Sequence, residues 1–176
     1  MRGPVCTLLV CTGALVATGA LRAQSLDAQS LDAHAGDWVW TADDAERQSI
    51  ATSIDGAVSG MNVLSANVAR MRLALANEPP ARLSLRFDAD ETVLSLDDTE
   101  VHVPSHGSAR TLGPGGERGR ASQEVVDHEL RLHFASMRGT RHITLAVRND
   151  RLIMTVRIES AHLGRDVRYT LTYRRA

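Results

Sequence analysis

Seven histidines are the side chains of this sequence best able to act as metal ligands or acid–base groups near neutral pH. A metal site requires several imidazoles to converge on one point. The spacing does not favour this: His128 and His133 are expected on opposite faces of one strand, and His142 on a polar face beside Thr144. Of the others, His34 is expected in a leader, His102 on a strand, His106 in the loop after that strand and His162 in a turn. We therefore predict hydrogen-bonded or solvated histidines and no metal site.

Acid, imidazole and acid follow one another at Asp127-His128-Glu129, a pattern with the groups needed for catalysis. Successive residues of a strand point to opposite faces, so these three side chains do not converge on one substrate. No serine lies in a strand–turn–helix motif that would expose it as a nucleophile, and Ser122, Ser136 and Ser160 are expected in ordinary strands or turns. We predict a non-enzymatic protein with no catalytic residues; a triad assembled by folding stays open.

Carboxylates gather at the turns between the early strands and offer hard oxygen ligands for calcium: Asp88, Asp90, Glu91, Asp97, Asp98 and Glu100. A recognised calcium loop has a glycine at a fixed place among its ligands, and no such loop frames these residues. Solvated turns are the simpler interpretation. The sequence also has no nucleotide-binding motif, so we predict no cofactor.

The basic residues are all arginine, because the 20 Lys+Arg positions include no lysine. With 21 acidic residues they give a formal net charge of −1, and the arginines are dispersed along the chain. A nucleic-acid-binding surface needs a basic stripe or patch. We predict no nucleic-acid partner.

The first residues have the pattern of an export signal. Arg2 precedes an uncharged apolar run, Val5–Ala20, that is shorter than a membrane span of about 20 residues. Ala20 or Ala23 supplies a small residue for cleavage. We expect residues 1–23 to be a signal peptide that is removed, which places the mature protein in the periplasm or outside the cell.

The rest of the chain is expected to be a short leader and one domain. Residues 24–35 contain a twofold polar repeat that buries too little apolar surface to order itself, so a flexible leader is predicted there. Residues 36–176 are of ordinary size for a single domain. The mature chain is expected to lack an integral membrane segment and, without Cys6 and Cys11, any thiol.

A helical segment is expected after Asp43, which with Glu46 fits a capping box. Apolar residues then recur at steps of three or four on a stripe that we expect to face the core: Ile50, Ile54, Val58, Met61, Leu64, Val68, Met71 and Leu75. One continuous rod would be longer than the domain is wide. A break near Gly60–Asn62 is therefore expected to give two helices, the second ending at Pro79-Pro80.

From Ala81 the apolar period changes from about 3.6 residues to about 2, which is typical of half-buried strands. Short, turn-like separators favour antiparallel neighbours, because parallel crossovers need a dozen or more residues. Pro104–Gly119 is the exception, expected to be a long mobile loop with one weak strand near Thr111-Leu112.

An antiparallel sheet of many strands with one apolar face curls or closes, which also removes its exposed edges. The predicted fold class is therefore mainly β: an antiparallel meander barrel or strongly bent sheet of about 8–10 strands, with a helical hairpin inserted after the first strand.

Gly36-Asp37-Trp38 resembles the Gly-x-Trp that opens the first strand of lipocalins, and a helix pair after that strand resembles fatty-acid-binding proteins. Both families are calycins. The strand Tyr169–Arg174 is also similar to the end of uncharacterised exported bacterial proteins. Fatty-acid-binding proteins hold a carboxylate with Arg-x-Tyr, whereas here Arg168 and Tyr169 are adjacent and point to opposite faces.

The lipocalin resemblance implies a structural role in barrel closure for Gly36, Trp38 and Arg175. In that family the tryptophan packs at the closed end of the barrel against an arginine from near the last strand. Alternation places Arg175 on the face of Tyr173, so Arg175, or failing that Arg174, is expected to stack on Trp38.

An inward aliphatic face either fills a barrel or lines a cavity for one small ligand. The resemblance favours a non-enzymatic exported protein that binds a small apolar or lipid-like ligand inside the barrel. Candidate ligand contacts are Phe134, Met154, Tyr169 and Tyr173. The alternative is a cell-envelope protein-interaction module with a filled core, which meets another protein through its outer Arg and Thr face or through Pro104–Gly119.

Overall fold

The computed structural model describes residues 31–176, which form ten strands and two helices. The expected signal peptide and the first residues of the expected leader lie outside the described residues. The helices are α2 (Asp44–Val58) and α3 (Val63–Ala76). The strands are β1 (Gly36–Trp40), β2 (Arg82–Phe87), β3 (Glu91–Leu96), β4 (Thr99–Pro104), β5 (Ala109–Leu112), β6 (Arg118–Val126), β7 (Glu129–Ser136), β8 (Gly139–Arg148), β9 (Arg151–Glu159) and β10 (Val167–Arg175).

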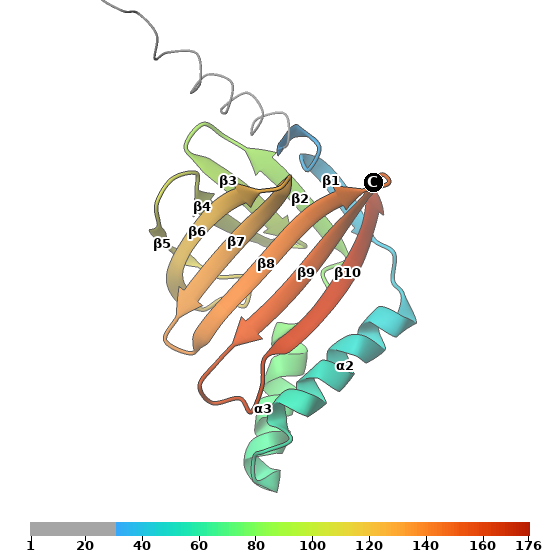
Figure 1. Cartoon of the computed structure of the whole chain (residues 1–176), viewed down its shortest axis with the longest axis vertical. Helices are drawn as coiled ribbons and strands as arrows, with labels where there is room; N and C mark the ends of the chain where they lie inside the picture. Colours follow the sequence, from blue (N-terminus) through green and yellow to red (C-terminus); the bar gives the residue numbers. More distant parts are fainter. Residues whose placement is uncertain (1–30) are drawn as a thin grey trace, which may run out of the picture.

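All ten strands form one antiparallel sheet in the order β4-β3-β2-β1-β10-β9-β8-β7-β6-β5. The sheet curls into a nearly closed barrel, with the two helices below one end (Figure 1). The first strand pairs with the last, Trp38 opposite Arg175. At the seam, β4 lies against β5 and β6 without a shared ladder. The predicted antiparallel meander barrel with a helical hairpin after the first strand is confirmed.

Two-residue turns join the long strands. Asp127 and His128 have φ angles of 52° and 65°, and Asn149 and Asp150 have 50° and 58°. Positive φ at both positions matches the twist of the flanking strands of a hairpin. His128 therefore lies in the β6–β7 turn, whereas the sequence analysis placed it on a strand face.

The long loop expected at Pro104–Gly119 is shorter than predicted, because β5 occupies Ala109–Leu112 and β6 begins at Arg118. In the link between β5 and β6, the Gly113 amide donates to the Glu117 carbonyl at 2.8 Å, which closes a tight turn. The weak strand expected near Thr111-Leu112 is confirmed.

Both helices begin at a side-chain cap. The Asp43 carboxylate accepts a hydrogen bond at 2.8 Å from the first turn of α2. Glu46 does not complete the predicted capping box, because its carboxylate instead accepts from Trp40 Nε1 at 2.7 Å. Helix α2 ends at Val58, and the Asn62 side chain accepts at 3.0 Å from the first turn of α3. The predicted break between the helices is confirmed.

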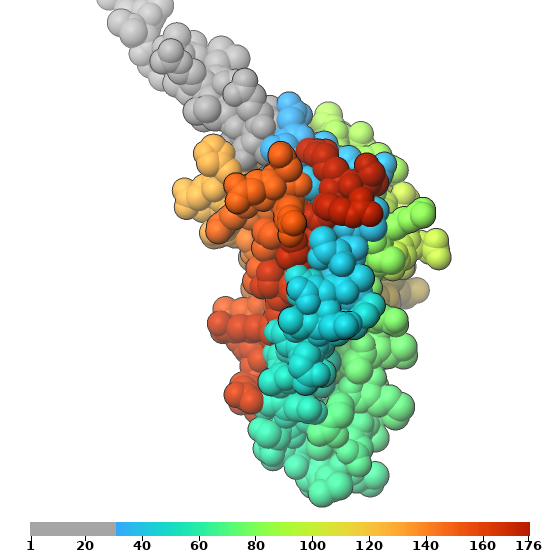
Figure 2. Space-filling model, turned by 90° about the vertical axis from the view of Figure 1, so that its right-hand side faces the viewer, coloured from blue at the N-terminus to red at the C-terminus, as the bar shows by residue number. Residues whose placement is uncertain are grey.

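The apolar helical stripe is buried in α2 and exposed in α3. In α2, which packs on β10, Ile54 is 2% exposed and Val58 is 1% exposed. In α3 the prediction of a core-facing stripe is wrong, because four of its members are exposed: Leu64, Val68, Met71 and Leu75. Smaller or less exposed residues, Ala66, Ala69 and Leu73, make up the opposite face of α3. Figure 2 shows the helices as one protrusion beyond the barrel.

This difference between the helices predicts two unequal losses of stability. Ile54→Ala should lower the free energy of unfolding by about 2–5 kcal/mol, because it leaves a cavity in a packed core. Leu64→Ala, at a residue that is 77% exposed, should change it by about 0.5 kcal/mol or less. Urea unfolding followed by circular dichroism measures both. A loss at Leu64 as large as that at Ile54 would mean that the outer face of α3 is covered in solution.

Candidate functional site

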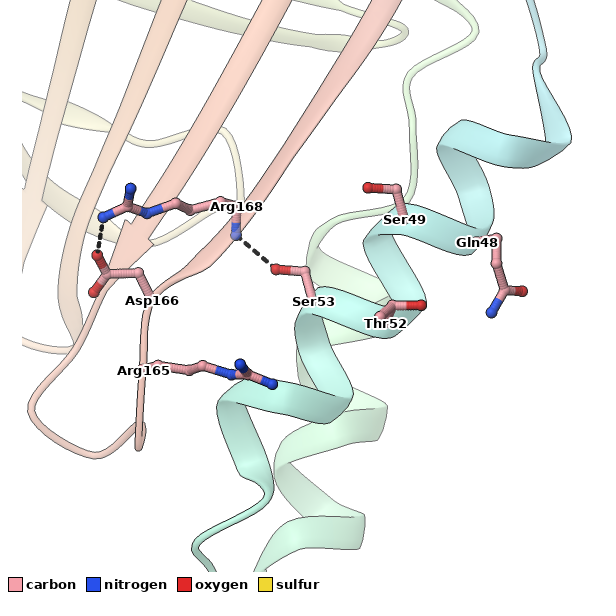
Figure 3. Close-up of a pocket in the computed structure, with 7 residues that line it drawn as sticks. All are labelled: Gln48, Ser49, Thr52, Ser53, Arg165, Asp166 and Arg168. Atoms are coloured by element: carbon pink, nitrogen blue, oxygen red, sulfur yellow. Dashed lines mark hydrogen bonds and ion pairs between the residues drawn. The ribbon is translucent and has the colours of Figure 1, made fainter.

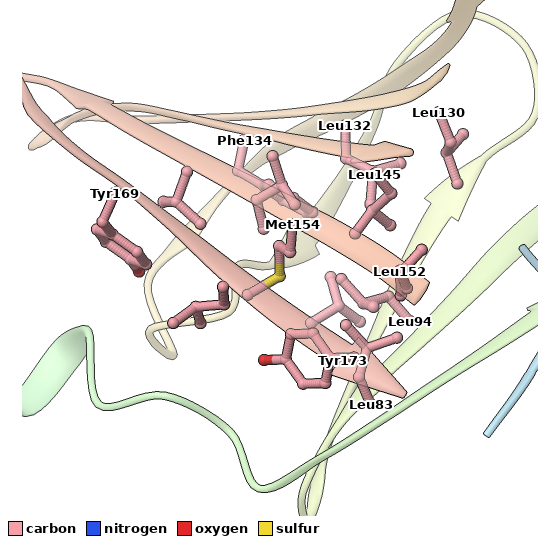
Figure 4. Packing of buried hydrophobic residues seen from close by; sticks show 14 of the residues in the cluster. Leu83, Leu94, Leu130, Leu132, Phe134, Leu145, Leu152, Met154, Tyr169 and Tyr173 are labelled. Atoms are coloured by element: carbon pink, nitrogen blue, oxygen red, sulfur yellow. The ribbon is translucent and has the colours of Figure 1, made fainter. Parts of the chain in front are cut away.

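One part of the barrel interior is filled by leucine side chains from six strands, β2, β3, β7, β8, β9 and β10 (Figure 4). Each is at most 1% exposed: Leu83, Leu85, Leu94, Leu130, Leu132, Leu145, Leu152 and Leu171. Such contacts at close-packed density leave little space for a ligand. All four predicted ligand contacts, Phe134, Met154, Tyr169 and Tyr173, belong to the buried core, and Phe134 and Tyr173 line no cavity described below.

The other part of the interior opens into a cavity of about 890 Å³ beside the end of α3. Its inner wall is formed by Ile143 of β8, Met154 and Val156 of β9, and Tyr169 of β10. Its mouth lies between the end of α3, the β3–β4 turn and the glycine-rich β5–β6 link. The structure therefore combines a packed core with a cavity at one end, and the predicted contacts Met154 and Tyr169 line that cavity.

The mouth of the cavity is charged. Arg72 of α3, Arg138 and Arg141 lie on one side, and Asp97 and Asp98 of the β3–β4 turn lie on another. Arg141 Nη2 also donates to the carbonyl of Ala76 at 3.2 Å and so ties β8 to the last turn of α3. An adjoining cavity of about 300 Å³ shares these three arginines.

Two tyrosine hydroxyls attach the sheet to the segment after α3. Tyr169 donates to Asn77 Oδ1 at 3.1 Å, and Tyr173 donates to the carbonyl of Pro80 at 3.3 Å. Burial raises the pKa of both phenols above its ordinary value, so both stay protonated near neutral pH. Asn77 is 2% exposed, and its amide nitrogen donates to Leu73 at 2.7 Å. Polar contacts therefore hold the helix end at the cavity mouth.

Sequence reasoning missed Arg141, although the signal was present. Arg141, Ile143 and Leu145 lie two residues apart along β8 and so share its inward face. Arg141 is also opposite the buried Phe134 in the ladder between β7 and β8. An arginine at an inward position near the end of a strand indicates a charged rim. Ala76 and Asn77 were also missed, because their position depends on how α3 meets the barrel.

The structure brings Gly36, Trp38 and Arg175 together at the opposite end of the barrel. The guanidinium carbon of Arg175 lies 4.4 Å from the centroid of the fully buried Trp38 ring. Gly36 has a φ of 107°, a backbone conformation that residues with a side chain rarely adopt. A Cβ at this position would also lie 3.3 Å from Arg175 Nη1, a tight contact. The expected stacking pair is present; its role in closing the barrel stays a prediction.

The end of the expected flexible leader is packed against this site, which corrects the prediction for residues 31–35. Arg175 donates to the carbonyls of Ala33 and Ala35 at 3.0 and 3.1 Å, and Trp38 Nε1 donates to the carbonyl of His34 at 3.0 Å. His34 is 1% exposed, and its Nε2 lies 3.0 Å from the carbonyl oxygen of Leu145. The polar repeat gives no indication of the His34 contact, because this contact depends on strand β8, which lies far along the chain.

A second hollow, a shallow groove between α2 and the start of β10, is polar (Figure 3). Ser53 Oγ accepts from the backbone amide of Arg168 at 2.7 Å. Hydrogen bonds from Arg168 and Arg157 lower the pKa of Asp166, which pairs with both at 2.9 and 2.8 Å. Because the Asp166 carboxylate already forms ion pairs with Arg157 and Arg168, the groove is the weaker candidate for a ligand site.

Residues 31–176 were expected to contain neither a metal site nor a membrane-spanning segment. No group of three or more His, Cys, Asp or Glu side chains there is arranged to hold a metal ion. None of the helices in this part of the chain is both long enough and apolar enough to cross a bilayer.

No protein-family model matches the chain, and no curated protein matches it. Solved structures do. Lipid binding protein 8 of Caenorhabditis elegans has 12% identity, a TM-score of 0.53, and a match covering 83% of this chain and 97% of its own. Fatty-acid-binding protein 1 of Echinococcus granulosus has 11% identity, a TM-score of 0.52, and coverage of 82% and 98%. The fluorescent protein UnaG has 11% identity, a TM-score of 0.52, and coverage of 83% and 99%. At such identities the likeness shows the fold alone: a nearly closed antiparallel barrel with two helices after the first strand.

The contacts of Arg175 predict that Arg175→Ala destabilises the protein. The change removes a cation–π contact and two hydrogen bonds to the leader, which together contribute about 1–3 kcal/mol. Arg174→Ala is the matched control, because Arg174 is exposed and donates one long hydrogen bond of 3.4 Å. Thermal unfolding followed by tryptophan fluorescence compares the two. Equal midpoints for both variants would contradict a stabilising role for the stack.

Proposed function

We propose that this protein is an exported, non-enzymatic binding protein that holds one small apolar or lipid-like molecule in the cavity beside α3. The observation that carries the proposal is the 890 Å³ cavity with an inner wall of Ile143, Met154, Val156 and Tyr169. The volume lies in the range of about 300–1,000 Å³ that is common for small-molecule sites, and the cavity combines an apolar inner wall with a charged rim. Burial of an aliphatic chain there gains about 25 cal/mol per Å² of apolar surface.

The fold supports this proposal by analogy. Two of the similar structures are named a lipid binding protein and a fatty-acid-binding protein. A fold hosts many functions, so the cavity of this chain carries the proposal and the similar structures support it. Export is proposed from the sequence, where Arg2 precedes the apolar run Val5–Ala20.

The arginines at the mouth define the orientation of the proposed ligand. Arg72, Arg138 and Arg141 offer planar donors that suit a carboxylate or phosphate, and the apolar wall lies farther inside. Arg168, adjacent to the inward Tyr169, is exposed on the outer face and is not available to an internal ligand. We therefore infer an amphipathic ligand with its acidic head at the mouth and its chain inside the barrel.

The first test is whether the protein carries a ligand. Protein purified from its own compartment should show one small apolar mass per chain in native mass spectrometry, and denaturation should release it. A dansyl-labelled fatty acid added to stripped protein should then bind with increased, blue-shifted fluorescence. A bare polypeptide that also fails to bind the probe would overturn the proposal.

Blocking the mouth should abolish probe binding without disturbing the core. Ala76→Trp places an indole at a position that lines the cavity, so probe affinity should fall by about tenfold or more. Ala74→Trp is the matched control, since Ala74 is exposed on the same helix and outside the cavity lining. Arg141→Met should weaken binding of the acid by about tenfold and spare the methyl ester, because it removes a charged donor. Equal binding by both tryptophan variants would place the ligand elsewhere.

A second candidate function, a cell-envelope protein-interaction module, is favoured by the exposed face of α3. Val63, Leu64, Met71 and Leu75 are 66–79% exposed, and contiguous apolar surface of this kind marks interaction sites. Leu64→Ser combined with Met71→Ser, two residues outside the cavity lining, should then prevent co-purification of a partner from the envelope while leaving fatty-acid binding unchanged. Retention of the partner by this double variant would exclude the α3 face.

A further inference from the structure

Two histidines face each other on the outer surface of the barrel, away from the cavity. His133 of β7 pairs with His142 of β8 across the ladder, and both flank inward residues, so both point outward. Their Nδ1 atoms lie 2.8 Å apart, and the rings are nearly perpendicular, at 85°. The side chains are 34% and 29% exposed, so ions from solvent can reach the pair.

The other ring nitrogens face carboxylates. His133 Nε2 lies 3.5 Å from Glu124 Oε1, and His142 Nε2 lies 3.5 Å from Glu159 Oε1. The His142 Nε2 atom is buried and makes no hydrogen bond within residues 31–176, so its nearest acceptor is that carboxylate. Carboxylates in these positions favour a hydrogen on each Nε2, which leaves a lone pair on each Nδ1.

Two Nδ1 atoms 2.8 Å apart cannot both present a bare lone pair, so without an ion one hydrogen must lie between them. A single shared proton satisfies this requirement, because one Nδ1 donates and the other accepts.

We propose that the Nδ1 atoms of His133 and His142 bind one divalent transition-metal ion of the kind that prefers imidazole, such as Zn²⁺ or Cu²⁺, in place of the shared proton. A tetrahedral ion with bonds of about 2.0–2.1 Å needs the nitrogens about 3.3 Å apart, which requires the two rings to separate by about half an ångström. Glu124 and Glu159 then orient the rings as carboxylates commonly do behind zinc-bound histidines.

This is an open site with two protein ligands, and water or a small anion fills the remaining positions. A site with two ligands is compatible with the absence, among residues 31–176, of any group of three or more His, Cys, Asp or Glu side chains that could hold a metal ion. Arg157 and Arg131 pair with the two carboxylates, at 2.8 Å to Glu159 and 3.9 Å to Glu124. These arginines repel a cation, so they keep the affinity below that of a closed site. The site is independent of the proposed ligand cavity.

The test is a titration of the purified protein with Zn²⁺ in a calorimeter at about pH 7.5, where imidazole is mostly neutral. Cys6 and Cys11 are replaced by serine in all samples, because thiolates bind zinc. We expect one ion per chain.

The variants locate the ion. His133→Gln and His142→Gln should each lower the affinity by about tenfold or more, and Glu159→Gln by about tenfold. His102→Gln is the matched control: His102 also lies on the outer surface, with its Nδ1 3.0 Å from Glu91, but it is not paired with a second imidazole, so affinity should not change.

Nitrogen-15 spectra of the protein with intact histidines provide a measurement that does not depend on how the variants fold. Zinc should shift the Nδ1 resonances of His133 and His142 and leave the other histidines unchanged. Absence of binding at millimolar Zn²⁺, binding that survives the loss of both histidines, or shifts confined to other imidazoles would each overturn the proposal.

Discussion

The pairing of β1 with β10 is the constraint on which the rest of the structure depends. Without it the sheet would be an open, strongly curved ribbon with two long edges. The ladder is short and consists of three residue pairs: Trp38 with Arg175, Val39 with Arg174 and Trp40 with Tyr173. Residues 31–176 contain no cysteine, so no disulfide supports this junction. The side chains around the junction supply the reinforcement: the Trp38–Arg175 stack and the contacts of the packed leader segment.

This reinforcement makes the two ends of the barrel different. At one end, aromatic and leucine side chains exclude water and the leader segment covers Trp38. At the other end, the chain returns from α3 to the sheet through hydrogen bonds from Tyr169, Tyr173 and Arg141. Individual hydrogen bonds contribute about 1 kcal/mol net and break locally at low cost. The end that is held by polar contacts is also the end with the cavity, so the proposed ligand would enter there without disturbing the packed part.

The sequence predicts elements well and their mutual placement less well. The change from a helical to a two-residue apolar period located the helix pair and most of the strands, because burial of one face imposes that period. The same period could not show that Leu64 and Leu75 of α3 face solvent, since it reports a shared face without reporting what covers it. His34 was assigned to a flexible leader on composition, whereas its burial depends on a carbonyl of β8 far along the chain. The cavity follows from α3 lying over one end, which no local pattern encodes.

Register explains the two features that were hardest to foresee. In the β7–β8 hairpin Ser136 pairs with Gly139, and that turn places Phe134 opposite Arg141 and His133 opposite His142. Gly139 has a φ of 143°, and a Cβ there would collide with the carbonyl of Glu159, so the turn depends on glycine at this position. A slip of one residue would exchange the two faces of β8, moving Arg141 away from the cavity mouth and separating the histidines. One turn therefore sets the charged rim inside the barrel and the imidazole pair outside it, although the two sites serve different chemistry.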